Sequence, residues 1–304
     1  MPGIESEIIR FVRASGPSTG SGVMKEIDAD PVAIWKTCFT AEDLLVRRVG
    51  SRYMRLDRHV DGYARLSPSI LREFLTYSIV GAADSADAVN ERCRALLDRI
   101  HEISRYKLTL ARQMVRDIIE EFDAPGRFPD ALCFILAGDI VYDMAHDVPR
   151  PERSTGRLVR GSDLDLVIVV PDDFPDDEIE RLDGIVYATK YRMLKSPSIN
   201  EEVDYKIKKL GRVREQCSFD NFTSMVAVKI LHEGILLGGS ESLFGIVKSL
   251  LEEHGLRRRM EELEERAAVF RKNAEELILR DKADEKMIKD MHLFYSAEEY
   301  EEFE

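Results

Sequence analysis

The sequence predicts an α+β fold in which helices flank a mixed sheet. Strand-like apolar runs are confined to the middle of the chain, and the clearest of them covers residues 164–170. Short helical patterns and turn residues precede this region, and long, highly charged helical patterns follow it. We therefore expect a module of helices and a hairpin, a helical connector, the sheet domain and a charged helical region, at residues 1–80, 81–127, 128–242 and 243–304.

The composition is that of a soluble globular protein. The 304 residues are 44% hydrophobic and 33% charged, and the chain is long enough for two or more domains. A net charge of −13 argues against a surface that binds nucleic acid everywhere, although a local basic patch is still possible. No apolar run approaches the roughly 20 residues that span a bilayer, and we expect no membrane partner.

The cysteines and the N-terminus indicate a cytoplasmic protein. The four cysteines are scattered without any CxxC pair, which excludes a disulfide framework and a zinc site of the usual spacing. The first residues mix acidic side chains into the apolar positions and lack the core of a signal peptide. We therefore expect a reducing compartment.

The first segment predicts three short helices and a hairpin. Residues 4–15 carry apolar side chains at helical spacing, residues 18–28 offer Ser and Thr caps, and Pro31 suits the first turn of a third helix. Glycines then punctuate short strand-like pieces in residues 46–69. Three helices followed by a small hairpin is the element order of a winged helix-turn-helix.

The predicted hairpin is rich in arginine. Seven arginines lie between Leu44 and Arg72 against two aspartates, with Tyr53 and Tyr63 among them. This local reversal of charge favours a wing that faces nucleic acid, or a phosphate-binding surface. A solvated charged hairpin, or a surface that faces the acidic remainder of the chain, has the same composition. The candidate nucleic-acid contacts are Arg47, Arg48, Arg52, Arg55 and Arg58.

Helical and strand patterns alternate in the rest of the chain. Residues 84–122 predict a long helix, and residues 131–146 a buried strand that runs through Gly138 into a helix-capable segment. Residues 147–161 read as a polar loop, and the following patterns as helix, strand, helix and short strand. Residues 247–291 carry acid–base partners at helical spacing, which predicts exposed helices that can mediate assembly into an oligomer.

Two aspartates mark the start of the best strand. Asp163 and Asp165 lie on one face of the strand because successive side chains point to opposite faces. Two close carboxylates repel each other unless a positive charge lies between them, and hard cations such as Mg²⁺ prefer carboxylate oxygens. Aspartates also serve as turn residues at a solvated strand end, so the pair alone does not decide between the two interpretations.

A third carboxylate and a glycine turn strengthen the metal interpretation. Asp204 alternates with Val203 and Tyr205, which places it on the polar face of a later strand. Upstream, Gly138 ends the apolar run at a predicted strand-to-helix turn, where main-chain N–H groups can hold phosphate.

In this order the elements resemble the nucleotidyltransferase fold of the DNA polymerase β superfamily. That family has an apolar strand, a Gly-Ser pair, a spacer, an acidic-x-acidic pair on a second strand and a third acid on a later strand. "SDLDL" at 162–166 matches the second element, and "ILHEGILLGGSESLF" at 230–244 is similar to the close of minimal nucleotidyltransferase domains. "ERSTGRLVRGSDLDL" at 152–166 resembles the loop of oligoadenylate-synthase-like enzymes, and the resemblance covers roughly residues 128 to 242.

The resemblance implies an enzyme that moves a nucleoside monophosphate from a nucleoside triphosphate such as ATP to a hydroxyl group on RNA, protein or a nucleotide. Asp163 and Asp165 would hold one or two Mg²⁺ or Mn²⁺ ions, and Asp204 would bind the second ion and help deprotonate the hydroxyl. The residues that would lie near the nucleotide are Gly138, Asp139 and Ser162. The residues that would counter phosphate charge are Arg157, Arg160, Lys190 and Arg192.

The chain departs from the family pattern at two places. Asp139 stands where the family has serine, and it would repel a triphosphate unless it turned away or helped to bind a cation. Gly138 and Asp163 are 25 positions apart, which implies an insertion around residues 146–154, and Ser162 could take over a phosphate contact. A second hypothesis is therefore a winged-helix, nucleic-acid-binding regulator whose nucleotidyltransferase-like domain senses a nucleotide without turning it over.

Overall fold

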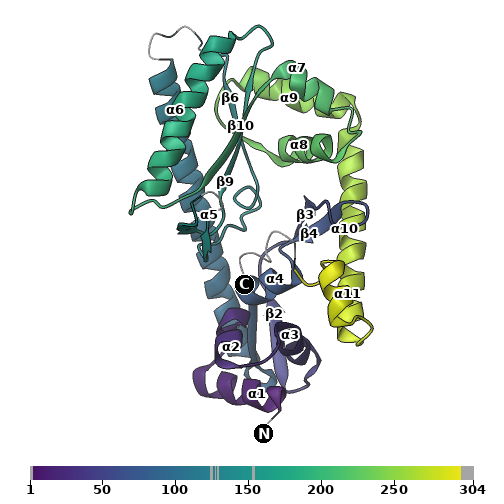
Figure 1. The fold of residues 1–304 in the computed structure, drawn as a ribbon. Coiled ribbons are helices and arrows are strands. Elements are labelled where there is room, and N and C mark those ends of the chain that lie inside the picture. Colours follow the sequence, from purple (N-terminus) through teal and green to yellow (C-terminus); the bar gives the residue numbers. More distant parts are fainter. Residues whose placement is uncertain (1–2, 124–125, 127, 129, 153–154, 296–304) are drawn as a thin grey trace. The chain divides into compact units, whose positions relative to one another are not determined.

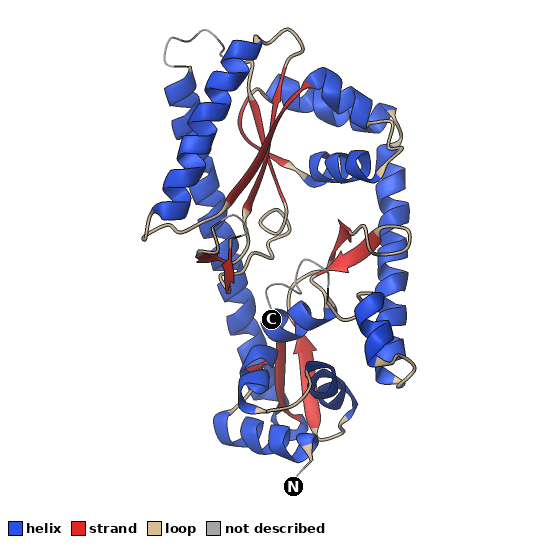
Figure 2. Cartoon of the chain, in the orientation of Figure 1, coloured by secondary structure: helices blue, strands red, loops and turns tan. Residues whose placement is uncertain are grey.

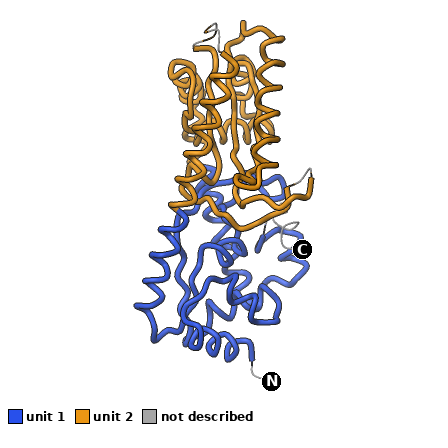
Figure 3. Tube along the Cα trace, turned by 90° about the vertical axis from the view of Figure 1, so that its left-hand side faces the viewer, with its two compact units in different colours: residues 1–100, 262–304 blue, residues 101–261 orange. Residues whose placement is uncertain are grey.

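The computed structural model describes residues 3–123, 126, 128, 130–152 and 155–295 (Figure 1). Helices and several small sheets make up the described chain (Figure 2), which is the mixed α+β class expected from the sequence. The chain divides into two compact units, of which the first joins residues 1–100 to residues 262–304 and the second covers residues 101–261 (Figure 3). This grouping differs from the four segments expected from the sequence (residues 1–80, 81–127, 128–242 and 243–304), and that division stays a prediction.

Unit 1 begins with the three short helices that the sequence predicts. Pro31 lies in the first turn of the third helix, whose N-terminus is capped by Asp30, because the Asp30 side chain accepts from the N–H of Ala33 at 2.9 Å. The elements of this unit are α1 (Ile4–Ser15), β1 (Ser18–Thr19), α2 (Gly20–Glu26), α3 (Pro31–Thr40), β2 (Leu44–Arg48), β3 (Tyr53–Leu56), β4 (Ala64–Ser67), α4 (Ile70–Tyr77), β5 (Ser78–Ala82), the first part of α5 (Ala86–Phe122), the second part of α10 (Leu256–Leu279) and α11 (Glu285–Asp290).

The small hairpin predicted after the three helices is present as β3 and β4, but the arginine-rich segment also contributes β2 to a second sheet. Strand β2 pairs with β5 in an antiparallel sheet of order β1-β5-β2, whereas β3 and β4 pair only with each other. The buried residues Ile79 and Val80 of β5 pair with β2 and draw it into this sheet, away from its neighbour in sequence. The five candidate arginines therefore lie on two sheets and the segments around them, at Arg47 and Arg48 on β2, Arg55 on β3, and Arg52 and Arg58 outside the strands.

Unit 2 is built on a four-stranded mixed sheet. Its strand order is β10-β9-β6-β11, with β9 and β10 parallel and β6 antiparallel to both β9 and β11. Its elements are the second part of α5, β6 (Cys133–Ala137), β7 (Pro149–Pro151), β8 (Leu158–Arg160), β9 (Leu164–Val170), α6 (Asp176–Lys195), β10 (Val203–Lys209), α7 (Leu210–Gln216), α8 (Phe222–Glu233), β11 (Ile235–Gly239), α9 (Glu241–Glu253) and the first part of α10.

The two faces of this sheet are covered by different helices. Leu164, Leu166 and Ile168 of β9 pack in one core with α5 and α6, whereas the alternate residues, beginning with Asp165, point to the face where α8 and α9 contact β6 (Figure 1). The polar face predicted for Asp204 is therefore the face that carries α8.

Two local predictions in this unit are wrong. No helix follows Gly138, because the chain turns and reaches the left-handed conformation at Asp143 (φ 58°), after which the Met144 N–H bonds back to the Asp139 carbonyl at 2.9 Å. Residues 147–161 are not simply a loop, since β7 and β8 pair in an antiparallel hairpin. No helix in the described part of the chain is long and apolar enough to cross a membrane.

Candidate functional site: a carboxylate cluster at the start of two parallel strands

Strands β9 and β10 bring the three predicted aspartates together. Asp165 and Asp204 are direct partners in the parallel register, and Asp163 precedes Asp165 by two residues on the same face. One carboxylate oxygen from each residue lies within 4.8 Å of the other two. The cluster therefore forms because two strands begin side by side with aspartates in matching positions.

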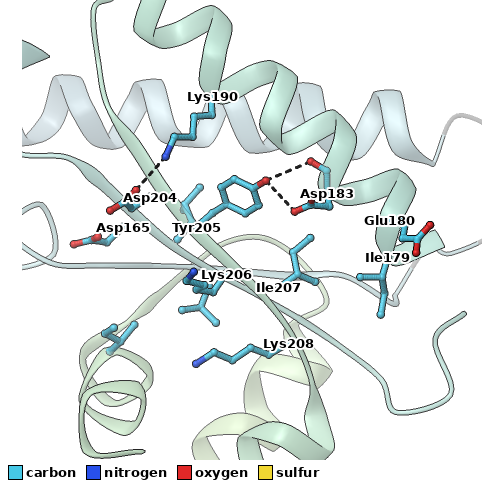
Figure 4. Close-up of a pocket in the computed structure, with 13 residues that line it drawn as sticks. Asp165, Ile179, Glu180, Asp183, Lys190, Asp204, Tyr205, Lys206, Ile207 and Lys208 are labelled. Atoms are coloured by element: carbon cyan, nitrogen blue, oxygen red, sulfur yellow. Dashed lines mark hydrogen bonds and ion pairs between the residues drawn. The ribbon is translucent and has the colours of Figure 1, made fainter. Parts of the chain in front are cut away.

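Two cations face this cluster. The guanidinium Nη2 of Arg150, on the hairpin strand β7, lies 3.5 Å from Asp163 Oδ2, and its Nη1 lies 2.8 Å from Glu202 Oε2. Lys190 of α6 reaches Asp204 Oδ1 at 3.1 Å (Figure 4). The sequence predicts Lys190 as a residue that would counter phosphate charge. It does not single out Arg150, because nothing in a polar, proline-containing segment indicates which arginine will face the aspartates.

Glu202 adds a fourth negative charge beside the cluster. Burial raises the pKa of this carboxyl group, the nearby Asp163 and Asp204 charges raise it further, and Arg150 opposes them. Negative charge thus accumulates at the start of β9 and β10, which is the electrostatic condition that favours a bound cation.

Gly138 lies close to Asp165. It adopts a positive φ of 80°, and a Cβ atom at this position would lie 2.6 Å from Asp165 Oδ2. Its N–H, which was expected to hold phosphate, donates to Glu233 Oε1 at 3.2 Å. Glu233 is also bound by Tyr142 Oη at 2.6 Å and by Lys229 Nζ at 2.5 Å, so a buried protein carboxylate takes the place predicted for an anion.

Asp139 is turned towards Ser162. The Ser162 hydroxyl donates to Asp139 Oδ2 at 2.7 Å and accepts from the His146 N–H at 3.1 Å. Among the described residues, Asp139 is not part of the three-aspartate cluster. Both residues therefore belong to the connection between the Gly138 turn and β9.

A buried ion pair fixes the entry to both strands. Lys107 of α5 pairs with Glu201, and both side chains are only 1% exposed. Lys107 Nζ also donates to the main-chain oxygens of Arg160 at 2.6 Å and Ser162 at 2.7 Å. Burial lowers the pKa of Lys107 and raises that of Glu201. Lys107 therefore holds together the segments that lead into β9 and β10.

Asp165 and Asp204 of the cluster line a pocket of about 810 Å³ along the edge strand β10 (Figure 4). Residues from both faces of the sheet reach this pocket, because β10 has a neighbouring strand on only one side. It is lined by Asp165, Leu166, Val167, Ile179, Glu180, Asp183, Lys190, Asp204, Tyr205, Lys206, Ile207, Lys208 and Ile230.

The other predicted phosphate contacts lie elsewhere. Arg157 is exposed, Arg160 offers its main-chain oxygen to Lys107, and Arg192 donates to Thr189 on its own helix at 2.8 Å.

Two of the candidate nucleic-acid contacts are held by carboxylates within unit 1. Arg52 Nε lies 2.6 Å and Arg48 Nε 2.9 Å from the carboxylate of Glu73, which Arg271 also approaches at 3.2 Å. Burial raises the pKa of Glu73, but the three guanidinium groups together hold it below its usual value. Arg48 and Arg52 thus join α4 to α10, while Arg47, Arg55 and Arg58 are exposed and their contact with nucleic acid stays a prediction.

Comparisons of the chain with models of known families, with curated proteins and with solved structures found no match.

Proposed function

We propose that this chain is a metal-dependent nucleotidyltransferase, which moves a nucleoside monophosphate from a nucleoside triphosphate to a hydroxyl acceptor. The observation that carries the proposal is the convergence of Asp163, Asp165 and Asp204, of which Asp165 and Asp204 line a pocket. The order of a strand, a glycine turn, a strand with two acids and a later strand with a third acid is also the order in the family that the sequence resembles.

The carboxylate geometry fits a divalent cation. Magnesium and calcium bind oxygen ligands at about 2.0–2.6 Å, so two oxygens on opposite sides of one ion lie about 4–5 Å apart. The spacing of up to 4.8 Å among the three carboxylates falls in this range. Oxygen ligands and excess negative charge are also the donor set that Mg²⁺ and Mn²⁺ prefer.

Different residues would bind the metal, accept the proton and position the two strands. Asp163 and Asp165 would hold the metal, which when bound stabilises the charge on the attacking and leaving oxygens. Asp204, which lines the pocket, would take the proton of the acceptor hydroxyl, and Lys190 at 3.1 Å would orient that carboxylate. Lys107 and Glu201 would hold the two strand entries at the spacing that this chemistry needs.

A transfer assay tests the proposal. The full chain would be incubated with each α-labelled ribonucleoside triphosphate, with Mg²⁺ or Mn²⁺, and with cellular RNA and protein. We expect label to enter one acceptor class, and the Asp163→Asn/Asp165→Asn double variant to lose this transfer. Asp173→Asn, which removes an exposed aspartate beyond the other end of β9, serves as the matched control and should transfer normally. Equal transfer by the double variant would rule out the proposed role.

A second candidate is a nucleotide sensor without turnover. Two observations favour it. The Gly138 N–H already donates to Glu233 and so does not face a phosphate. Asp139, which stands where the family has serine, accepts a hydrogen bond from Ser162. Measuring Mn²⁺ and nucleotide binding alongside the transfer assay separates the two candidates. Binding that needs the aspartates but produces no transfer would favour the sensor.

A further inference from the structure

Two lysines, Lys206 and Lys208, line the same pocket as Asp165 and Asp204, and the proposed function does not use them. Lys206 and Lys208 alternate along β10 with Tyr205 and Ile207, so they lie on the same face of the strand as Asp204. Figure 4 shows both side chains on the side of β10 away from Tyr205 and Asp183. Both line the pocket, together with Ile230 of α8.

Neither lysine is neutralised by the protein. In the described chain, Lys206 and Lys208 form no ion pair with a carboxylate, and Lys208 Nζ donates to the amide oxygen of Gln216 at 3.1 Å. Their neighbours differ, because Lys209 pairs with Asp176 at 2.6 Å and Lys190 pairs with Asp204 at 3.1 Å. Lys206 is exposed and Lys208 is half-buried, so the pocket presents two cations without a carboxylate partner in a chain of net charge −13.

Keeping Lys208 charged in the folded protein costs free energy. Burial, followed by the charges of Arg212 and Lys206, lowers the pKa of Lys208 from 10.5 to about 8. An anion from outside the protein would relieve the repulsion.

We propose that Lys206 and Lys208 bind a phosphate group of a ligand in this pocket. Phosphate suits two ammonium groups because it carries up to two negative charges and several strong acceptor oxygens. Lys206 and Lys208 lie two and four residues beyond Asp204, or about 7 and 13 Å along the strand at about 3.3 Å per residue, so this phosphate would lie further along β10 than a group held at the aspartates. The inference goes beyond the proposed function, since the lysine pair requires neither the metal nor the aspartates.

Binding of inorganic pyrophosphate without metal tests this site. The full-length Asp163→Asn/Asp165→Asn variant would be titrated with pyrophosphate in EDTA at pH 7 by calorimetry. We expect binding that weakens roughly tenfold or more with either Lys206→Met or Lys208→Met, as the loss of a charge-assisted hydrogen bond implies. Lys209→Met is the matched control, because it removes an adjacent lysine that already has a carboxylate partner, and it should leave the affinity unchanged.

Two results would overturn the proposal, namely no pyrophosphate binding, or binding that both lysine substitutions leave intact. Because the aspartates are absent from this background, failure here is distinct from failure of the transferase proposal.

Phosphate in the pocket can come from a nucleoside triphosphate or from a phosphorylated acceptor such as a nucleic-acid chain. The same variants would be titrated with ATP and with a 5′-phosphorylated trinucleotide. A Lys208→Met effect confined to ATP assigns the site to the nucleotide, and an effect confined to the trinucleotide assigns it to the acceptor. If Lys208→Met weakens the binding of neither ligand, the proposal is overturned.

Discussion

Lys208 illustrates at the scale of one residue how a site can cost stability. Its pKa is lowered from 10.5 to about 8, first by burial and then by Arg212 and Lys206. Between pH 8 and 10.5 the unfolded chain binds this proton and the folded chain does not, so the free energy of unfolding rises with pH in this window. Below pH 8 the charged lysine opposes folding by on the order of 3 kcal/mol, at about 1.4 kcal/mol per pKa unit.

We expect Lys208→Met to stabilise the folded protein. The gain should be about 1–3 kcal/mol at pH 7, since methionine keeps the apolar stem and removes the charge, and it should shrink as the pH approaches 10. Urea unfolding at both pH values, with Lys209→Met as the control, measures the effect. A destabilised Lys208→Met variant at pH 7 would show that the ammonium group is not under repulsion.

Single residues could be predicted from the sequence where local geometry alone places them. Alternation along the strands placed Asp163, Asp165 and Asp204 on one face, and the register brings them together. Sequence alone gave no signal for Arg150 or Glu233, because the contacts of each depend on how distant segments pack. The contact between the Gly138 N–H and Glu233 joins residues 95 positions apart.

At the scale of elements, α5 is tied to the sheet through Lys107. Replacing Lys107 with Met would leave Glu201 buried without its cation, and breaking a buried pair in this way costs about 3–5 kcal/mol. We expect Lys107→Met to lower the free energy of unfolding by this amount, and a Lys107→Met/Glu201→Gln double variant to recover part of it. Urea unfolding of these two variants and of the Glu201→Gln single variant checks this. A double variant as unstable as the sum of the two single changes would contradict the direct coupling.

The same scale explains which elements could be predicted. Helices α1, α2, α3 and α6 follow from their own periodicity and turn residues, and they form where the sequence predicts them. The pairing of β2 with β5 could not be read from the chain, because about thirty residues separate the two strands and the arginine-rich segment between them has its own hairpin, β3–β4. The small hairpin was therefore predictable, whereas the second sheet that takes up β2 was not.

For the whole molecule, the division into two units has a consequence for folding. Among the described residues, the core around β9 draws only on the continuous segment 101–261. The core of unit 1 instead combines residues such as Trp35 and Phe74 with Ile278 and Phe294 from the far end of the chain. Unit 2 therefore has what an independent domain needs, whereas residues 1–100 alone lack part of their core.

We accordingly expect a fragment of residues 101–261 to fold by itself and to bind Mn²⁺ through the three aspartates. Circular dichroism and cooperative thermal unfolding would establish the fold, and paramagnetic resonance of Mn²⁺, with the Asp163→Asn/Asp165→Asn fragment as the control, would measure binding. A fragment of residues 1–100 should unfold at a lower temperature than the same fragment mixed with residues 262–304, because the second piece supplies Ile278 and Phe294 to the core. If residues 101–261 show no cooperative transition, unit 2 depends on the rest of the chain, and binding would then have to be measured on the full chain alone.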